Sequence, residues 1–436
     1  MNIKLEYEQY RKDIIDIVRI FQDEVNFVDD SDIVIGKDYI FTGAMLPFSS
    51  KLELKRLLYT YLADKHQYTS PWGLITGTKP QKLYNKYDEA YILENYLISP
   101  EKLKILREIE KGHRMKAFSK NNIHLYINIP FCPSRCSYCS FPTIIYTKND
   151  RRQEYLDGLK SEILALRDAF ENRNLRTIYI GGGTPSALTY KQMEDLFKTL
   201  QDSFDLSSLE EFTVEAGRED TLDKDKLDLM KAYHVTRISI NPQSFNEKTN
   251  QRIGRNQDLD SLKKLYKLAV DMGFIVNMDL ILGLSGESIS EVENTFNEIE
   301  KLMPHNLTVH TLSLKKGSKL NESGDSLNDE RKAIKDMIDL SQNLTKKMEY
   351  KPYYLYRQKE ILGNLENIGY CLDDQLCIYN IVSNEENESI LGLGMTSNSK
   401  ILVDNNIVKY TNYKNLDEYL DKLDQQILEK RKILED

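Results

Sequence analysis

The stretch Phe131-Cys132-Pro133-Ser134-Arg135-Cys136-Ser137-Tyr138-Cys139-Ser140 places three cysteines in one short loop, directly after the alternating segment Leu125-Tyr126-Ile127-Asn128-Ile129-Pro130. Three thiolates can hold a metal, but they leave a tetrahedral site, or one iron of a four-iron cluster, without a protein ligand. Such an open position is where a metal site can bind a substrate. The loop therefore predicts a reactive metal centre at the end of a strand.

Two other uses of these cysteines are weaker. A structural zinc needs a fourth ligand, yet His124 lies on the preceding strand, and Cys371 and Cys377 are far along the chain. Disulfides are disfavoured because the cysteine count of 5 is odd and no apolar signal-peptide core opens the chain. No run approaches the roughly 18 apolar residues of a membrane span. We expect a cytoplasmic protein with no membrane span.

Chain length and net charge limit the number of domains and the kinds of binding partner that we expect. A chain of 436 residues is too long for one compact core, so two or three domains are expected. The formal net charge of -9 argues against a nucleic-acid partner, because duplex binding depends on a basic face.

From about residue 124 the chain alternates short β-rich runs with amphipathic helical runs, which is typical of a parallel α/β fold. A helix is expected at 153–170, and Thr189 with Gln192 forms a capping-box pair that begins another. Six βα units are too few for a closed eight-stranded barrel, so we expect a partial (β/α)6 barrel with its active site at the carboxyl ends of the strands. The expected strands are 124–130, 177–181, 211–216, 237–242, 275–282 and 306–314.

The flanking regions differ from this pattern. Residues 1–120 predict an N-terminal α+β domain, with Trp72 as a packing residue. Residues 121–325 form the expected barrel, and residues 326–436 a mainly helical C-terminal extension that closes on an amphipathic helix.

Polar and glycine residues stand where the expected strands end. Gly181-Gly182-Gly183-Thr184-Pro185-Ser186 follows the second strand, and consecutive glycines let the backbone approach a ligand. Glu215 and Gln243 end the third and fourth strands, and Asp279 lies inside an apolar strand. A buried carboxylate is costly unless it is paired or ligand-bound. For Asp279 the alternatives are a ligand contact and an ion pair with Arg255 or Arg237.

Together, the Cys-x3-Cys-x2-Cys loop with an aromatic before its last cysteine and the Gly-Gly-Gly-Thr-Pro turn resemble the radical S-adenosylmethionine (SAM) superfamily. The strand-end residues and the segments 71–77, 238–243, 353–359 and 390–394 resemble its oxygen-independent coproporphyrinogen III oxidase (HemN-like) family, most of all the HemZ subgroup. The resemblance implies that residues 326–436 are a HemN-like C-terminal region. The resemblance implies one four-iron four-sulfur cluster on Cys132, Cys136 and Cys139, with SAM on the fourth iron. Its implied SAM contacts are Tyr126, Tyr138, Gly182, Gly183, Thr184, Glu215, Gln243, Arg255 and Asp279.

In that family a 5'-deoxyadenosyl radical drives the decarboxylation of two propionates of coproporphyrinogen III, giving protoporphyrinogen IX of haem biosynthesis. The resemblance thus implies an oxidoreductase with a tetrapyrrole substrate, an electron donor such as a flavodoxin, ferredoxin or reductase, and one or two bound SAM molecules. We expect a monomer. The basic residues Arg218, Arg255, Arg357 and Lys359 are candidate propionate contacts, and no catalytic side chain is assigned.

One departure and two alternatives qualify this expectation. Decarboxylating relatives carry a further cysteine soon after the third ligand, in a Cys-x-Cys arrangement, whereas here Ser140 and then Phe141-Pro142-Thr143 follow Cys139. A haem chaperone of the HemW type is an alternative, but its histidine and tryptophan signature after the barrel is missing, because no histidine follows His310 and Trp72 is the only tryptophan. Another radical reaction on a tetrapyrrole, such as methyl transfer with ring opening, is the third hypothesis.

Overall fold

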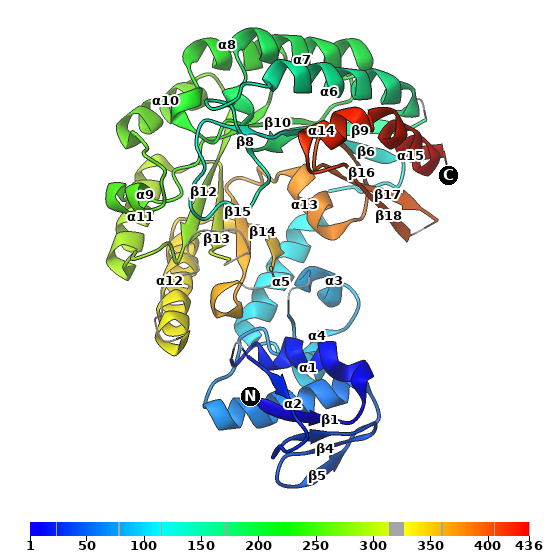
Figure 1. The fold of residues 1–436 in the computed structure, drawn as a ribbon. Helices are drawn as coiled ribbons and strands as arrows, with labels where there is room; N and C mark the ends of the chain where they lie inside the picture. The colour runs from blue at the N-terminus through cyan, green and yellow to red at the C-terminus, as the bar shows by residue number, and fades with distance from the viewer. Residues whose placement is uncertain are drawn as a thin grey trace.

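Six parallel strands in sequential order form the centre of the molecule (Figure 1). The computed structural model describes residues 1–435 except 23, 77–78, 115, 171, 314–326, 359–360 and 405. The central strands match the six that the sequence predicts, and the first and last are not paired with each other, so the barrel is open as expected. The strands are β6 (Asn122–Ile129), β9 (Asn174–Gly182), β10 (Glu211–Glu215), β11 (Arg237–Ser239), β12 (Ile275–Leu282) and β13 (Asn306–Thr311).

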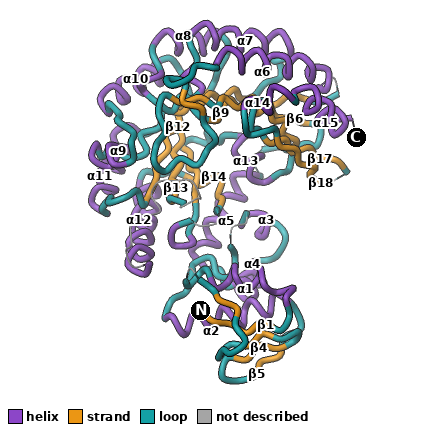
Figure 2. The backbone as a smooth tube through the Cα atoms, in the orientation of Figure 1, coloured by secondary structure: helices purple, strands orange, loops and turns teal. Residues whose placement is uncertain are grey.

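Helices cover the outer face of these strands, and Figure 2 shows the strands enclosed by the helical arc. The predicted capping box is present: the Thr189 hydroxyl accepts from the Gln192 N–H, and the Gln192 side chain accepts from the Thr189 N–H. On the first helix, Tyr155, Leu159 and Ile163 are fully buried against the sheet, as their helical spacing predicts. The covering helices are α6 (Arg152–Leu166), α7 (Tyr190–Ser203), α8 (Lys224–Ala232), α9 (Glu247–Arg252), α10 (Leu259–Asp271) and α11 (Ile289–Leu302).

The C-terminal region contains the expected helices and also strands that the sequence interpretation missed. β15 pairs antiparallel with β13 and carries β14 at one edge of the sheet, whereas β16 pairs parallel with β6 at the other edge and carries the hairpin of β17 and β18. The region is therefore a mixture of helix and strand rather than a mainly helical extension, because its tyrosine- and β-branched-rich runs suit a pleated surface. Its elements are α12 (Leu327–Lys347), β14 (Lys351–Tyr356), β15 (Asn367–Cys371), α13 (Ile378–Glu385), β16 (Ser389–Leu393), β17 (Asn398–Val403), β18 (Asn406–Thr411), α14 (Leu416–Asp421) and α15 (Leu423–Glu435).

The N-terminal residues form a smaller lobe beside the barrel (Figure 1). Its mixed sheet has the order β2-β1-β3-β4-β5, and a separate apolar core that runs from Ile3 to Leu74 fills it. The division of the chain at residue 120 stays a prediction. The elements here are β1 (Asn2–Leu5), α1 (Arg11–Val18), β2 (Asn26–Phe27), β3 (Val34–Ile35), β4 (Tyr39–Phe41), β5 (Met45–Pro47), α2 (Lys51–His66), α3 (Pro80–Tyr84), α4 (Glu89–Tyr96) and α5 (Pro100–His113).

Trp72 joins this lobe to the C-terminal region. The indole is fully buried, and its Nε1–H donates to Glu366 Oε2 at 2.6 Å. Lys102 pairs with the other oxygen of the same carboxylate, and both side chains are buried. The prediction that Trp72 is a packing residue is thus confirmed, with the addition of a buried hydrogen bond. None of the described helices combines the length and the apolar surface that crossing a bilayer would require.

Candidate active site

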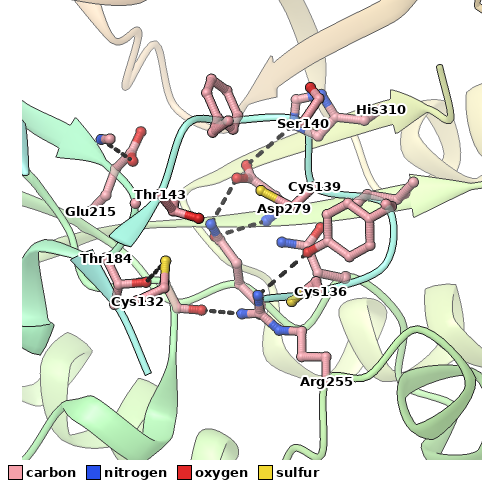
Figure 3. Close-up of a pocket in the computed structure, with 18 of the residues that line it drawn as sticks. Cys132, Cys136, Cys139, Ser140, Thr143, Thr184, Glu215, Arg255, Asp279 and His310 are labelled. Carbon is pink, nitrogen blue, oxygen red and sulfur yellow. Dashed lines mark hydrogen bonds and ion pairs between the residues drawn. The ribbon is translucent and has the colours of Figure 1, made fainter. Parts of the chain in front are cut away.

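One pocket opens at the carboxyl ends of the parallel strands (Figure 3). The strands bring to it side chains that lie far apart in the sequence, because successive parallel strands end at the same edge of a sheet. Every residue that the sequence assigns to the cluster or to SAM lines this pocket: Tyr126, Cys132, Cys136, Tyr138, Cys139, Gly182, Gly183, Thr184, Glu215, Gln243, Arg255 and Asp279.

The cysteine loop is closed by a short pair of strands, β7 (Phe131–Cys132) and β8 (Ile144–Ile145). Cys132 Sγ lies 3.3 Å from Thr184 Oγ1, so the loop contacts the glycine turn of the next strand. Burial raises the pKa of the Cys132 thiol to about 11 and also raises that of Cys139. A bound metal would reverse this cost, because its positive charge favours the thiolate.

The glycine turn has no room for side chains. Gly182 has a φ of +115°, and a Cβ there would meet Asn128 Oδ1 at 2.3 Å. A Cβ on Gly183 would meet the Phe131 carbonyl oxygen at 2.8 Å and Cys132 Sγ at 3.1 Å. The turn therefore packs its backbone directly against the first cysteine.

Glu215 stands at the end of β10, partly exposed to the pocket. Its Oε1 accepts from the Tyr179 hydroxyl at 2.6 Å, and its Oε2 accepts from the Gly182 N–H at 3.2 Å. Burial raises the pKa of this carboxyl to about 7 in spite of the Tyr179 hydrogen bond, and the charge of Asp279 adds to the rise. A carboxylate at the carboxyl end of the strand can accept hydrogen bonds from the hydroxyl groups of a ligand.

Asp279 is not paired with Arg255 or Arg237, so the ion-pair alternative is wrong. Its carboxylate accepts from Asn241 Nδ2 and from Asn277 Nδ2, each at 2.8 Å, and His310 Nε2 lies 3.8 Å from Oδ1. Burial acts to raise the pKa of Asp279, but hydrogen bonding and charge from His310 hold it below its usual value. An ionised carboxylate therefore faces the pocket.

Two further polar side chains carry atoms without partners. Among the described residues, Gln243 Oε1 and Arg255 Nε are buried and have no hydrogen-bond partner. Gln243 has a positive φ of 62°, a strained backbone for a residue with a side chain, and Arg255 donates to the carbonyl oxygens of Gly217 and Asn241. An unsatisfied buried polar atom costs free energy in the folded chain.

The residues present fit an iron–sulfur cluster with an adenosyl ligand beside it. The donor set is three thiols on one loop, and the glycine backbone, two carboxylates and two unsatisfied polar groups lie around the same pocket. Among the described residues, no group of three His, Cys, Asp or Glu side chains already stands at metal-ligand spacing. The assignment of the three cysteines as ligands therefore stays a prediction.

The sequence interpretation missed part of the pocket and misplaced some substrate contacts. His310, Tyr356, Gln358 and Asn367 also line it. His310 could have been found, because it stands near the end of a predicted strand, as Asp279 does on its neighbour. The last three could not, because their strands were not expected.

Of the candidate propionate contacts, Arg357 is buried away from the pocket, where it donates to the carbonyl oxygens of Ile75, Asn364 and Leu365. Its assignment is wrong. Arg218 lines the pocket but is held by Asp220 through two hydrogen bonds of 2.9 and 2.6 Å. Lys359 lies outside the described residues.

Comparison with known proteins identifies relatives. The model of the radical SAM superfamily matches residues 126–299. The oxygen-independent coproporphyrinogen-III oxidase-like protein HemZ of Bacillus subtilis (strain 168) is 38% identical over 82% of this chain and 75% of its own length. The heme chaperone HemW of Lactococcus lactis subsp. lactis (strain IL1403) is 36% identical, but over only 41% of this chain and 46% of its own length.

A similar fold occurs in a solved structure. Coproporphyrinogen III oxidase (HemN) from Escherichia coli, described as a radical SAM enzyme, aligns with a TM-score of 0.57 over 84% of this chain and 78% of its own, at 21% identity. At that identity the match speaks for the fold alone.

Proposed function

Because the chain belongs to the family of oxygen-independent coproporphyrinogen III oxidase-like proteins in the radical SAM superfamily, we propose that its pocket holds one four-iron four-sulfur cluster on Cys132, Cys136 and Cys139 and binds SAM beside it. The observation that carries the proposal is the convergence of the cysteine loop, the glycine turn and the polar residues Glu215, Gln243, Arg255 and Asp279 on one pocket. When bound, the cluster supplies the electron that cleaves SAM to a 5'-deoxyadenosyl radical.

The chain's own residues bind and orient SAM in this proposal. The backbone of Gly182 and Gly183 lies open to a small polar group such as the methionine amino group, since no side chain covers it. Glu215 and Asp279 present carboxylate oxygens for ribose hydroxyls. Gln243 and Arg255 line the same pocket and add polar contacts. Tyr126, Tyr138 and Thr184 complete the set of contacts.

We propose further that the reaction is the oxidative decarboxylation of coproporphyrinogen III to protoporphyrinogen IX. Its support is the family membership and the likeness along most of the chain to HemZ. The electron donor is expected to be a flavodoxin, a ferredoxin or a reductase. Decarboxylating relatives carry a further cysteine soon after the third ligand, whereas here Ser140 and Phe141 follow Cys139, so the number of SAM molecules bound is also to be measured on the reconstituted protein.

The test is anaerobic reconstitution with iron and sulfide, followed by incubation with SAM, a reductant and coproporphyrinogen III. The expected products are 5'-deoxyadenosine and a vinyl-bearing porphyrinogen, measured together by liquid chromatography and mass spectrometry. Release of 5'-deoxyadenosine without decarboxylation would point to another substrate. Stoichiometric haem uptake without turnover would overturn the enzyme assignment in favour of a chaperone.

A further inference from the structure

The pocket has a second wall, which the proposed SAM contacts hardly use. It lies on β13, β15 and β14, and the last two strands are antiparallel additions from the C-terminal region rather than part of the six-stranded barrel. The polar residues that line the pocket from these strands, and from the residues just after them, are His310, Thr311, Ser313, Tyr356, Gln358 and Asn367.

Tyr356 and His310 are coupled on this wall. The Tyr356 hydroxyl reaches across β15 and lies 3.0 Å from His310 Nδ1, while His310 Nε2 faces Asp279 at 3.8 Å. When Nδ1 of His310 carries a hydrogen, that N–H donates to the Tyr356 oxygen and leaves the phenol O–H to donate into the pocket. Burial, with the charge of Asp279, raises the pKa of Tyr356, which keeps that hydrogen in place.

The rear of the wall is held rigidly by the N-terminal lobe. Side chains alternate along a strand, so Arg357 points away from the pocket beside Tyr356, and Glu366 does so beside Asn367. Arg357 donates to the Ile75 carbonyl oxygen and lies 5.3 Å from the Trp72 ring centroid, and Glu366 accepts from Trp72. These buried contacts of Trp72 with Arg357 and Glu366, here called the joint around Trp72, connect the N-terminal lobe to the ends of the two strands that form the wall.

Each of the three arginines that line the pocket in the described part of the chain is already engaged, and Arg135 donates to the Cys139 carbonyl oxygen at 3.3 Å. Arg218 is held by Asp220, and Arg255 donates to two backbone carbonyl oxygens. An anionic substrate therefore finds hydrogen-bond donors on the second wall more readily than free cations in the inner part of the pocket.

We infer that this wall is the substrate-binding face, and that the Tyr356 hydroxyl, oriented by His310, donates to a propionate carboxylate of the tetrapyrrole. The inference rests on the proposed function and deepens it. It makes Tyr356 a specificity-determining residue, separate in effect from the SAM contacts, and His310 a positioning residue.

The test measures two affinities on the reconstituted full-length protein. Coproporphyrin III, a fluorescent and air-stable tetracarboxylate, reports the tetrapyrrole site, and equilibrium dialysis reports SAM. Tyr356→Phe should weaken coproporphyrin binding roughly ten-fold and leave SAM binding within about two-fold, as loss of one hydrogen bond to a charged group predicts. The matched control Tyr190→Phe, on the exposed surface of α7, should change neither affinity.

Two variants of His310 separate orientation from packing. His310→Leu should lose much of the affinity that Tyr356→Phe loses, because the imidazole that orients the phenol is then gone. His310→Asn keeps an N–H donor near the position of Nδ1 and should recover most of the affinity.

Unchanged coproporphyrin binding in Tyr356→Phe, or equal losses for coproporphyrin and SAM, would overturn the inference while leaving the proposed function standing. Wild-type protein that binds SAM and no tetrapyrrole would instead overturn the proposed substrate and the inference with it.

Discussion

Replacing Glu215 by glutamine should stabilise the metal-free protein and weaken its hold on SAM. The pKa of Glu215 is about 7 in the folded protein against a usual 4.5. Between these values the folded state keeps a proton that the unfolded state releases, so stability falls as the pH rises through this window. Above pH 7 the full cost of the buried charge is present. A difference of about 2.5 pH units corresponds to at most about 3 kcal/mol.

Glutamine has the shape of glutamate and does not titrate. Its amide can face Tyr179, whose oxygen accepts, while its carbonyl oxygen still accepts from the Gly182 N–H. The gain in unfolding free energy of Glu215→Gln over wild type should therefore be small near pH 4.5 and grow to a plateau of up to about 3 kcal/mol above pH 7.

The assay is urea unfolding at a series of pH values, followed by circular dichroism, on protein without cluster. Glu300→Gln is the matched control. Its side chain is 48% exposed in an ion pair with Lys347, so its change should stay within about 0.5 kcal/mol at every pH. On the cluster-loaded protein, SAM binding to Glu215→Gln should weaken by roughly ten-fold or more. Parallel pH profiles for wild type and Glu215→Gln would refute the argument about burial.

Three further results are expected. Gly183→Ala should fail to assemble the cluster, seen as loss of bound iron, because the new Cβ would lie 3.1 Å from Cys132 Sγ; normal iron content would mean that the turn can move aside. Cys136→Ala should abolish the charge-transfer absorption of the reconstituted protein, whereas Cys371→Ala, which is buried away from the pocket, should keep it; a full cluster in the first variant would refute the ligand assignment. Glu366→Ala should lower the unfolding free energy by about 3–5 kcal/mol, because it leaves the buried Lys102 unpaired. Fluorescence of the single tryptophan during urea unfolding measures this change. A loss below about 1 kcal/mol would contradict the view of Lys102 and Glu366 as a closed buried ion pair.

The barrel was predictable because its signals are local. Runs of β-branched residues alternate with helical periodicity, and caps such as that of Thr189 act within one turn. The C-terminal strands were not predictable in the same way. Residues 353–356 read as an aromatic run with no turn partner nearby, and their pairing with β15 and the barrel edge depends on contacts between distant parts of the chain.

In the candidate site, too, the local motifs were predictable from the sequence and the contacts between distant residues were not. The cysteine loop and the glycine turn are each one continuous stretch of sequence, so the sequence alone can predict their chemistry. The neighbours of Asp279 are not: an ion pair with an arginine was a reasonable alternative, and the folded chain surrounds the carboxylate with two asparagines and a histidine instead. Likewise, the sequence suggested Arg357 as a substrate contact, but in the folded chain its guanidinium donates to the Ile75 carbonyl oxygen of the N-terminal lobe.

Residue order alone was therefore enough to establish the parallel barrel and the chemical class of its pocket, since both rest on short-range patterns and on motifs whose members are adjacent. The wall that faces the cysteine loop, the shifted pKa of Glu215 and the joint around Trp72 emerged only from the folded molecule. Each of these depends on burial and on which strands become neighbours, and both are properties of packing between segments that lie far apart along the chain.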